Sequence, residues 1–268
     1  MTRLWGFGIA AGAFFFLILV WTLKVDQSLG PSNFISGWAV FGVLVALVLF
    51  NGRKRLPFLP LASASWWFYF HITGGFLVVF LFWLHTDIIW PNSLYNQALV
   101  FMFYSVSITG IIGLFIEKTY PKSLTQSGVE YIYERIPERI AEIRAEAESL
   151  IEECTEKTGS DTLAKHYLEQ NSLYWFFIRP RFFFNHIFRG RAAKHWIKNQ
   201  CSLLDRYLND EELAYSKKIF DLANTKRIMD FHYSMQRVLK GWLLVHVPLS
   251  TGLMVLALWH FVVVQVYL

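Results

Sequence analysis

The sequence predicts an all-α integral membrane protein with five transmembrane helices and one helical, polar insert between helices four and five. Of its residues, 54% are hydrophobic and only 17% are charged, which is unusual for a soluble domain of this size. The charges are also unevenly placed, because residues 1–116 hold seven of them and residues 117–240 hold most of the rest. We therefore expect membrane helices in 1–116 and 241–268, separated by the insert 117–240.

The spans are predicted from length, since a bilayer core requires about 20 apolar residues of helix. The first apolar segment resembles a signal peptide, but its apolar run is too long and no small-residue cleavage site precedes Lys24. The third has tryptophans near both ends, as expected at the two membrane interfaces. The five predicted spans are 4–23, 34–50, 64–84, 98–116 and 242–266.

The expected orientation follows from basic residues in the short loops. Arg53, Lys54 and Arg55 lie between spans two and three, whereas the loop between spans three and four has no basic residue. This distribution places the amino terminus and the insert on the cytoplasmic side, with a bacterial inner membrane as the expected location. Spans three and five then cross the membrane in the same direction.

The insert has a divided charge and one apolar stretch. Residues 117–170 have a net charge of −5 and include an acidic helical pattern at 129–157, while residues 171–240 have a net charge of +7. The apolar stretch "YWFFIRPRFFFNHIF" contains two arginines, which would be costly inside a bilayer, so we expect it at the interface. Two interpretations remain for the insert: a helical hairpin whose halves pair with each other, or a docking surface for a soluble partner or anionic lipid.

Several cofactor motifs are missing from the sequence. Cys154 and Cys201 are isolated, and no CxxC occurs, so iron–sulfur ligation and thiol-attached haem have no support. No GxGxxG or P-loop pattern follows a strand-like run, and no nucleic-acid motif is present. We therefore expect no nucleotide or flavin site of a recognisable kind and no nucleic-acid partner.

Four histidines form the most informative pattern. His71 and His85 lie fourteen residues apart at the third span, and His246 and His260 repeat this spacing at the fifth. Fourteen residues of helix return to within about 40° of the same face and rise about 21 Å. On parallel helices this spacing sets His71 opposite His246 at the cytoplasmic level, and His85 opposite His260 at the outer level.

Two imidazoles at each of two depths suit the two axial positions of a haem iron, so two haem b groups are expected. A zinc site would require three or four protein ligands at one depth. Three glycines, Gly74, Gly75 and Gly252, are expected to permit close approach beside the rings. Basic groups available to a cytoplasmic haem propionate are Arg53, Lys54, Arg55, Arg237 and Lys240, of which an arginine is expected and Arg237 is the residue to test. The alternative for Arg53, Lys54 and Arg55 is that they only set the topology. On the outer side Asn92, Tyr95 or Asn96 would serve, or a partner would contribute the group. The competing interpretation is that these histidines only form interhelical hydrogen bonds.

This histidine pattern resembles the dihaem membrane cytochromes b, and most closely the ferric-reductase-like transmembrane domain family. In that family the third and fifth helices each carry two histidines thirteen or fourteen residues apart. His71 and His85 match the first pair, and His246 and His260 match the second. The family usually has a sixth helix, a flavin and nicotinamide domain, and a short link between helices four and five. The five spans and long insert of this sequence depart from that plan, and favour a subunit over a self-contained reductase.

The expected function is electron transfer across the membrane by a dihaem b-type cytochrome that belongs to a larger, hetero-oligomeric oxidoreductase. Its redox partner would be a protein on the cytoplasmic side, or quinone in the membrane. One alternative is a quinone-reactive cytochrome b, acting as a subunit of a quinol dehydrogenase or quinone reductase. The other is a non-redox membrane scaffold or transporter with structural histidines.

Overall fold

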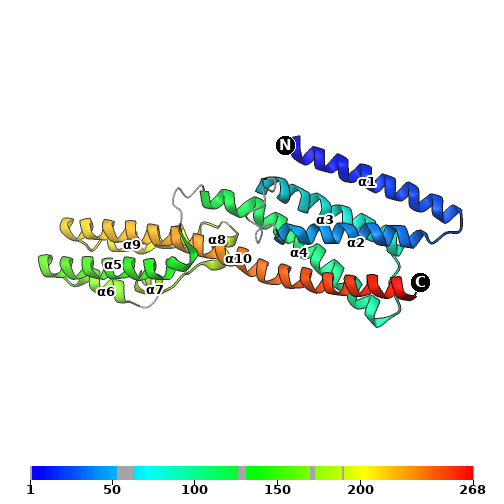
Figure 1. The fold of residues 1–268 in the computed structure, drawn as a ribbon. Coiled ribbons are helices and arrows are strands. Elements are labelled where there is room, and N and C mark those ends of the chain that lie inside the picture. The colour runs from blue at the N-terminus through cyan, green and yellow to red at the C-terminus, as the bar shows by residue number, and fades with distance from the viewer. Residues whose placement is uncertain (1, 53–62, 126–130, 170–172, 189, 268) are drawn as a thin grey trace. The chain divides into compact units, whose positions relative to one another are not determined.

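The protein is helical throughout the part that the structure describes. The structure is a computed structural model that describes residues 2–52, 63–125, 131–169, 173–188 and 190–267. No strand occurs in these ranges (Figure 1). Five of the helices are long and apolar enough to cross a membrane, which confirms the predicted all-α class with five candidate spans and indicates an integral membrane protein.

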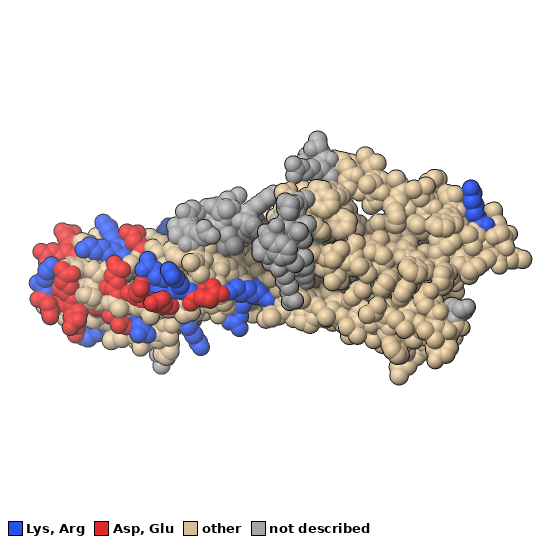
Figure 2. Space-filling view, in the orientation of Figure 1, with Lys and Arg blue, Asp and Glu red and all other residues tan. Residues whose placement is uncertain are grey.

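The chain divides into two compact units. Unit 1 comprises Met1–Phe115 and Trp242–Leu268, and unit 2 comprises Ile116–Gly241. The face of unit 1 seen in Figure 2 is almost entirely uncharged, whereas lysine, arginine, aspartate and glutamate gather on unit 2. A surface with so few charged groups suits a lipid environment, where charged side chains are costly.

Unit 1 contains three complete helices and parts of two more. These are α1 (Thr2–Gln27), α2 (Ser32–Gly52), α3 (Ala64–Thr86), the first part of α4 (Leu94–Thr125) and the last part of α10 (Asp210–Tyr267). Asp87 ends α3 in the left-handed conformation, with φ of 49°. Helix α3 packs against both α1 and α2.

The core of unit 1 is apolar and aromatic. The rings of Phe82 on α3 and Phe103 on α4 stack with their centroids 3.9 Å apart, and Phe41 on α2 stacks on Phe261 of α10 at 4.4 Å. Many other large apolar side chains, such as Phe101 and Val255, are more than 60% exposed on the unit's surface. Exposed apolar area of this extent is expected where lipid replaces water as the solvent.

Two helices are longer than the spans predicted within them. Helix α4 continues past the predicted end at 116 to Thr125, and α10 begins at Asp210, well before the predicted start at 242. Charged residues mark those extensions as polar, but charge does not end a helix. Pro248 lies inside α10, which continues through it.

Unit 2 is built around one buried face of α5 (Ile136–Thr158). Its buried side chains recur every three or four residues, the spacing of a single helical stripe, while its glutamates point outward. The helix follows a short 3₁₀ turn, η2 (Tyr133–Arg135), and ends at Gly159, which has φ of 68°. The other helices are α6 (Thr162–Leu168), α7 (Leu173–Ile178), α8 (Phe183–Ile187), α9 (Ala192–Leu204) and the first part of α10.

The acidic and basic halves of unit 2 are joined mainly by apolar packing. Phe176 and Phe177 of α7, Ile197 of α9 and Ile219 of α10 share one core with the buried face of α5. Most of the ion pairs seen among the described residues are local pairs within one helix, and Lys240–Glu134 is the one that joins the two halves. The halves therefore pack together as a helical unit through buried side chains more than through their opposite charges.

Candidate functional site

The four histidines of the fourteen-residue pattern all lie in unit 1 and interact in two pairs. His71 of α3 interacts electrostatically with His246 of α10, and His85 of α3 interacts in the same way with His260 of α10. Helices α3 and α10 therefore run in the same direction, with one pair of imidazoles at each of two levels. The role of these pairs as metal ligands stays a prediction.

The ring orientation of His85 is set by the start of α2. Its Nδ1 lies 3.0 Å from the backbone carbonyl oxygen of Asn33, and 3.3 Å from Oγ of the fully buried Ser36. Because a carbonyl can only accept, Nδ1 carries the proton and donates it to Asn33. The Ser36 hydroxyl donates to the same carbonyl, at 3.1 Å. Nε2 of His85 is thus left with its lone pair, which is the form that can bind a metal.

Thr109 of α4 sets the orientation of His246. Nδ1 of His246 lies 2.9 Å from Oγ1 of Thr109. The single hydroxyl proton of Thr109 is already donated to a backbone carbonyl, of Ser105 or of Val106, each at 2.9 Å. When the hydroxyl proton is donated to one of these carbonyls, the hydroxyl accepts from His246, whose Nδ1 then carries the proton and whose Nε2 keeps its lone pair.

Trp242 adds a second contact to the same site. Its ring stacks on the His246 imidazole with the centroids 5.2 Å apart and the planes 18° from parallel. Its indole N–H donates to the backbone carbonyl of Thr109 at 2.8 Å. Thr109 therefore fixes the imidazole through its side chain and the stacking ring through its backbone.

The remaining two histidines also contact neighbouring helices. The imidazole of His71 interacts with the backbone carbonyl of Leu47 on α2. The ring of His260 stacks on Tyr95 of α4, with centroids 6.2 Å apart and planes 20° from parallel. The Tyr95 hydroxyl donates to the backbone carbonyl of Leu256 at 2.7 Å, which ties α4 to α10 at this level.

The supporting residues repeat the histidine spacing. Asn33 and Leu47 are fourteen residues apart on α2, and Tyr95 and Thr109 are fourteen residues apart on α4. Helix α2 runs antiparallel to α3 and supports both of its histidines, while α4 runs antiparallel to α10 and supports both of the others. Sequence reasoning missed this arrangement on α2, because a backbone carbonyl has no sequence signal. Thr109 was missed too, although a step of fourteen residues from Tyr95 would have found it.

A cavity of about 340 Å³ reaches the pair formed by His85 and His260. This volume lies in the range of small-molecule sites. Most of its wall is apolar, and it includes Val40, Phe82, Phe103 and Leu253 from the core of unit 1. Polar groups enter the wall from Asn33, Asn96 and Gln265.

Of the three predicted glycines, only Gly74 lies close to a neighbouring helix. A Cβ atom on Gly74 would lie 2.9 Å from Cδ2 of Leu47, so this glycine permits the close approach of α2 rather than of α10. A Cβ on Gly75 or on Gly252 would meet nothing within 4 Å. These two positions border open space, which does not by itself require glycine.

Two other glycines face the site closely and were not singled out from the sequence. A Cβ on Gly37 would lie 3.0 Å from Cε1 of His85, and a Cβ on Gly113 would lie 2.0 Å from Cζ2 of Trp242. Any larger residue at Gly113 would displace the ring that stacks on His246. Their sequence signal was weak because both glycines occur in ordinary apolar runs.

The residues expected to hold propionates have other contacts or lie elsewhere. Arg237 lies in unit 2, where its guanidinium donates to the Tyr233 hydroxyl at 2.7 Å. Of the three residues expected at the other level, Asn96 lines the cavity beside His85 and His260, Asn92 is exposed, and the Tyr95 hydroxyl donates to the Leu256 carbonyl. The basic cluster Arg53, Lys54 and Arg55 lies outside the described residues.

In the described ranges, no three side chains among histidine, cysteine, aspartate and glutamate converge as a metal cluster would require. The ligands available to a metal are therefore the two imidazoles of each histidine pair. Comparisons of the chain with protein-family models, with curated proteins and with solved structures find no match.

Proposed function

We propose that this protein is a dihaem b-type membrane cytochrome that carries electrons across the membrane as a subunit of a larger oxidoreductase. The observation that carries the proposal is the arrangement of the four imidazoles. They form two pairs on parallel helices. The Asn33 carbonyl holds the Nδ1 proton of His85, so that Nε2 can act as a ligand, and the Thr109 hydroxyl lies where it can do the same for His246. Histidines that bind metals characteristically donate their second ring N–H in this way.

The residues present fit haem b. His71 with His246 would hold one haem, and His85 with His260 the other; each haem would supply a one-electron carrier when bound. Asn33 and Thr109 would keep the imidazole protons at Nδ1 and the rings in a fixed orientation. The apolar wall of the cavity beside His85 and His260 would limit the access of water, and it suits a porphyrin face.

The proposed carrier requires partners, because the sequence contains no motif for a group that accepts a hydride. We propose a redox partner protein on the cytoplasmic side or quinone in the membrane, and a hetero-oligomeric complex in a bacterial inner membrane. Arg237 remains the proposed contact for a propionate of the haem between His71 and His246. One electron that crosses a potential of 100 mV gains or loses about 2.3 kcal/mol, so the direction of flow would depend on the membrane potential.

A quinone-reactive cytochrome b is the second candidate function. The observation that favours it is that three residues with side-chain amides, Asn33, Asn96 and Gln265, line the cavity beside His85 and His260. Side-chain amides could hydrogen-bond the carbonyl oxygens of a quinone. Oxidation of quinol by the purified chain alone, lost in Asn96→Leu with both haems retained, would favour this candidate.

The proposal is tested by haem content and by single replacements of the four histidines. We expect two haems per chain by pyridine haemochrome analysis, and low-spin spectra. His71→Ala and His246→Ala should remove the same haem, and His85→Ala and His260→Ala should remove the other. A purified chain that binds no haem would instead support the non-redox scaffold or transporter. Loss of the same haem in His71→Ala and His260→Ala would refute the pairing.

A further inference from the structure

Unit 2 exposes large aromatic side chains on α7 and α8. Trp175 is 48% exposed, Phe184 is 72% exposed and Phe188 is 80% exposed. Phe184 and Phe188 are four residues apart, which places them on the same side of α8 and its end. Exposed phenylalanines at neighbouring positions are unfavourable in water and indicate a surface that contacts something apolar.

The same stretch carries only positive charge. Residues 171–204 contain six lysines and arginines and no aspartate or glutamate. Arg179 and Arg191, which flank the exposed phenylalanines in the sequence, are both exposed. A partner that combines negative charge with an apolar layer beneath it would match both features.

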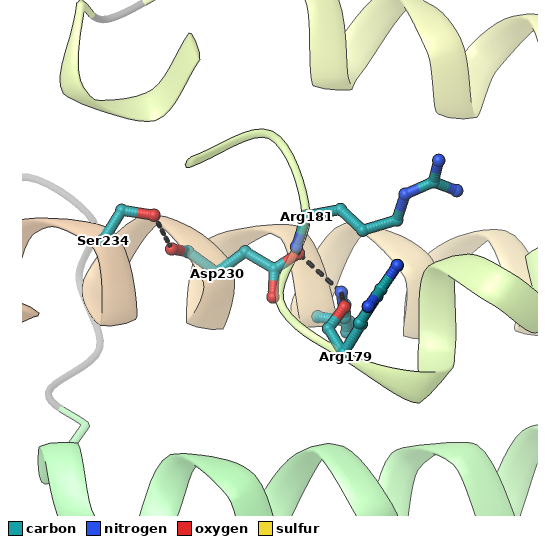
Figure 3. Close-up of polar contacts among 5 residues, drawn as sticks. Arg179, Arg181, Asp230 and Ser234 are labelled. Atoms are coloured by element: carbon teal, nitrogen blue, oxygen red, sulfur yellow. Dashed lines mark hydrogen bonds and ion pairs between the residues drawn. The ribbon is translucent and has the colours of Figure 1, made fainter. Parts of the chain in front are cut away.

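A buried ion pair on α10 holds the backbone of the turn between α7 and α8 in place. Lys226 and Asp230 of α10 are both fully buried, and the Lys226 ammonium donates to Asp230 Oδ2 at 2.6 Å. The same ammonium donates to the backbone carbonyl of Arg179 at 2.8 Å, and the backbone N–H of Arg181 donates to Asp230 Oδ2 at 3.3 Å (Figure 3). The clamp therefore holds the turn without using the guanidinium of Arg179.

Side-chain packing rigidifies the clamp further. The Lys226 ammonium lies 4.0 Å from the centre of the Phe176 ring, and the Arg181 guanidinium lies 5.6 Å from the centre of the Trp196 ring. In Figure 3 the Arg181 side chain extends away from Asp230. The turn thus presents its aromatic and cationic side chains from a fixed backbone.

An anionic lipid surface matches these features, because it presents negatively charged headgroups above an apolar layer. The same chain has five helices among its described residues that are long and apolar enough to cross a membrane, so a lipid surface is a partner that this protein meets.

We propose that the segment Leu173–Phe188 docks on an anionic lipid surface. Trp175, Phe184 and Phe188 enter the boundary between headgroups and acyl chains, and Arg179 and Arg191 contact the lipid phosphates. This proposal concerns unit 2 and is independent of whether unit 1 binds haem.

The test uses the full-length chain in nanodiscs, with an environment-sensitive fluorophore on a single introduced cysteine. The label is placed at Phe184→Cys or, as the reference, at Glu152→Cys on the exposed acidic side of α5. The native Cys154 and Cys201 are buried, and the unsubstituted chain measures their background labelling. Lipids with a spin-label quencher high on the acyl chain report contact, in discs with and without phosphatidylglycerol.

We expect several-fold stronger quenching at position 184 than at position 152 when phosphatidylglycerol is present. Arg179→Gln should reduce this quenching, because it removes one headgroup contact and leaves the clamped carbonyl in place. Lys217→Gln, which removes an exposed lysine from α10, should leave the quenching unchanged. Equal quenching at positions 184 and 152 would overturn the proposal and would favour an acidic protein surface as the partner. Quenching that is the same without phosphatidylglycerol would overturn the role of the arginines.

Discussion

Replacement of Thr109 by valine tests the proposed role of the His246 support most directly. Valine has nearly the shape of threonine but lacks the hydroxyl that accepts from His246 Nδ1 at 2.9 Å. The backbone carbonyl of Thr109, which accepts from Trp242, is retained. The stacked tryptophan should therefore stay in place while the imidazole loses its acceptor. Thr109→Ser is the matched control, since it keeps the hydroxyl.

The size of the effect follows from the hydrogen bond. A buried hydrogen bond of this kind contributes about 1 kcal/mol, and a donor left unpaired costs about 1–3 kcal/mol. An acceptor on Nδ1–H makes the imidazole a stronger donor to iron, which favours the ferric state. If about 1 kcal/mol of this preference is lost, the midpoint potential of the haem proposed between His71 and His246 should rise by about 40 mV, because 59 mV corresponds to a tenfold change for one electron.

The assay is a spectroscopic redox titration of the purified protein that resolves the two proposed haems. We expect an upward shift of one potential in Thr109→Val, no shift of the other, and values close to the unsubstituted protein in Thr109→Ser. The reasoning would be refuted by an unchanged potential in Thr109→Val, or by a shift of the haem that depends on His85. An equal shift in Thr109→Ser would assign the effect to packing instead.

Three further outcomes are expected. Lys226→Met should lower the free energy of unfolding by about 3–5 kcal/mol, because it leaves a buried carboxylate unpaired, and adding Asp230→Leu should recover most of that loss in denaturant titrations followed by circular dichroism. Burial, followed by nearby cationic side chains, lowers the pKa of His186 to about 4, below its usual value near 6.5, so the unfolded chain binds more protons between these values. Stability should therefore fall by up to about 3 kcal/mol as the pH drops from 6.5 to 4 and be unaffected by this group above 6.5; His186→Leu should remove that part of the pH dependence. Gly113→Val should displace Trp242, which sits where its side chain would lie, and change the spectrum of one haem only, whereas an unaltered spectrum would contradict the packing described here.

The parts of the fold that depend on composition could be predicted from the sequence. The five apolar segments appear as five candidate spans, and the acidic pattern before Thr158 appears as a helix. The ends of α4 and α10 were not predicted, because their polar extensions remain helical and α4 and α10 continue through Pro121 and Gly241, residues that often end a helix. Hydropathy indicates whether a segment contacts lipid or water, but it does not indicate where a helix ends.

The histidine spacing was visible in the sequence, but the groups that orient the imidazoles mostly were not. The acceptors for His71 and His85 are backbone carbonyls, which any residue type could supply. The buried Lys226–Asp230 pair was also missed, because a lysine and an aspartate four residues apart on a helix usually form an exposed pair. Its burial depends on α7 and the following turn, which come from a distant part of the chain.

The shared fourteen-residue spacing has a consequence for which length changes this protein can tolerate. One residue inserted between Asn33 and Leu47 would rotate one of these two acceptors by about 100° and shift it by about 1.5 Å along α2 relative to the other. Only one histidine of α3 could then keep its partner on α2. An insertion between Tyr95 and Thr109 on α4 would have the same effect on the two histidines of α10. Segment length is therefore matched within two pairs of neighbouring helices: 33–47 with 71–85, and 95–109 with 246–260. A change of length in one segment of a pair requires the same change in the other.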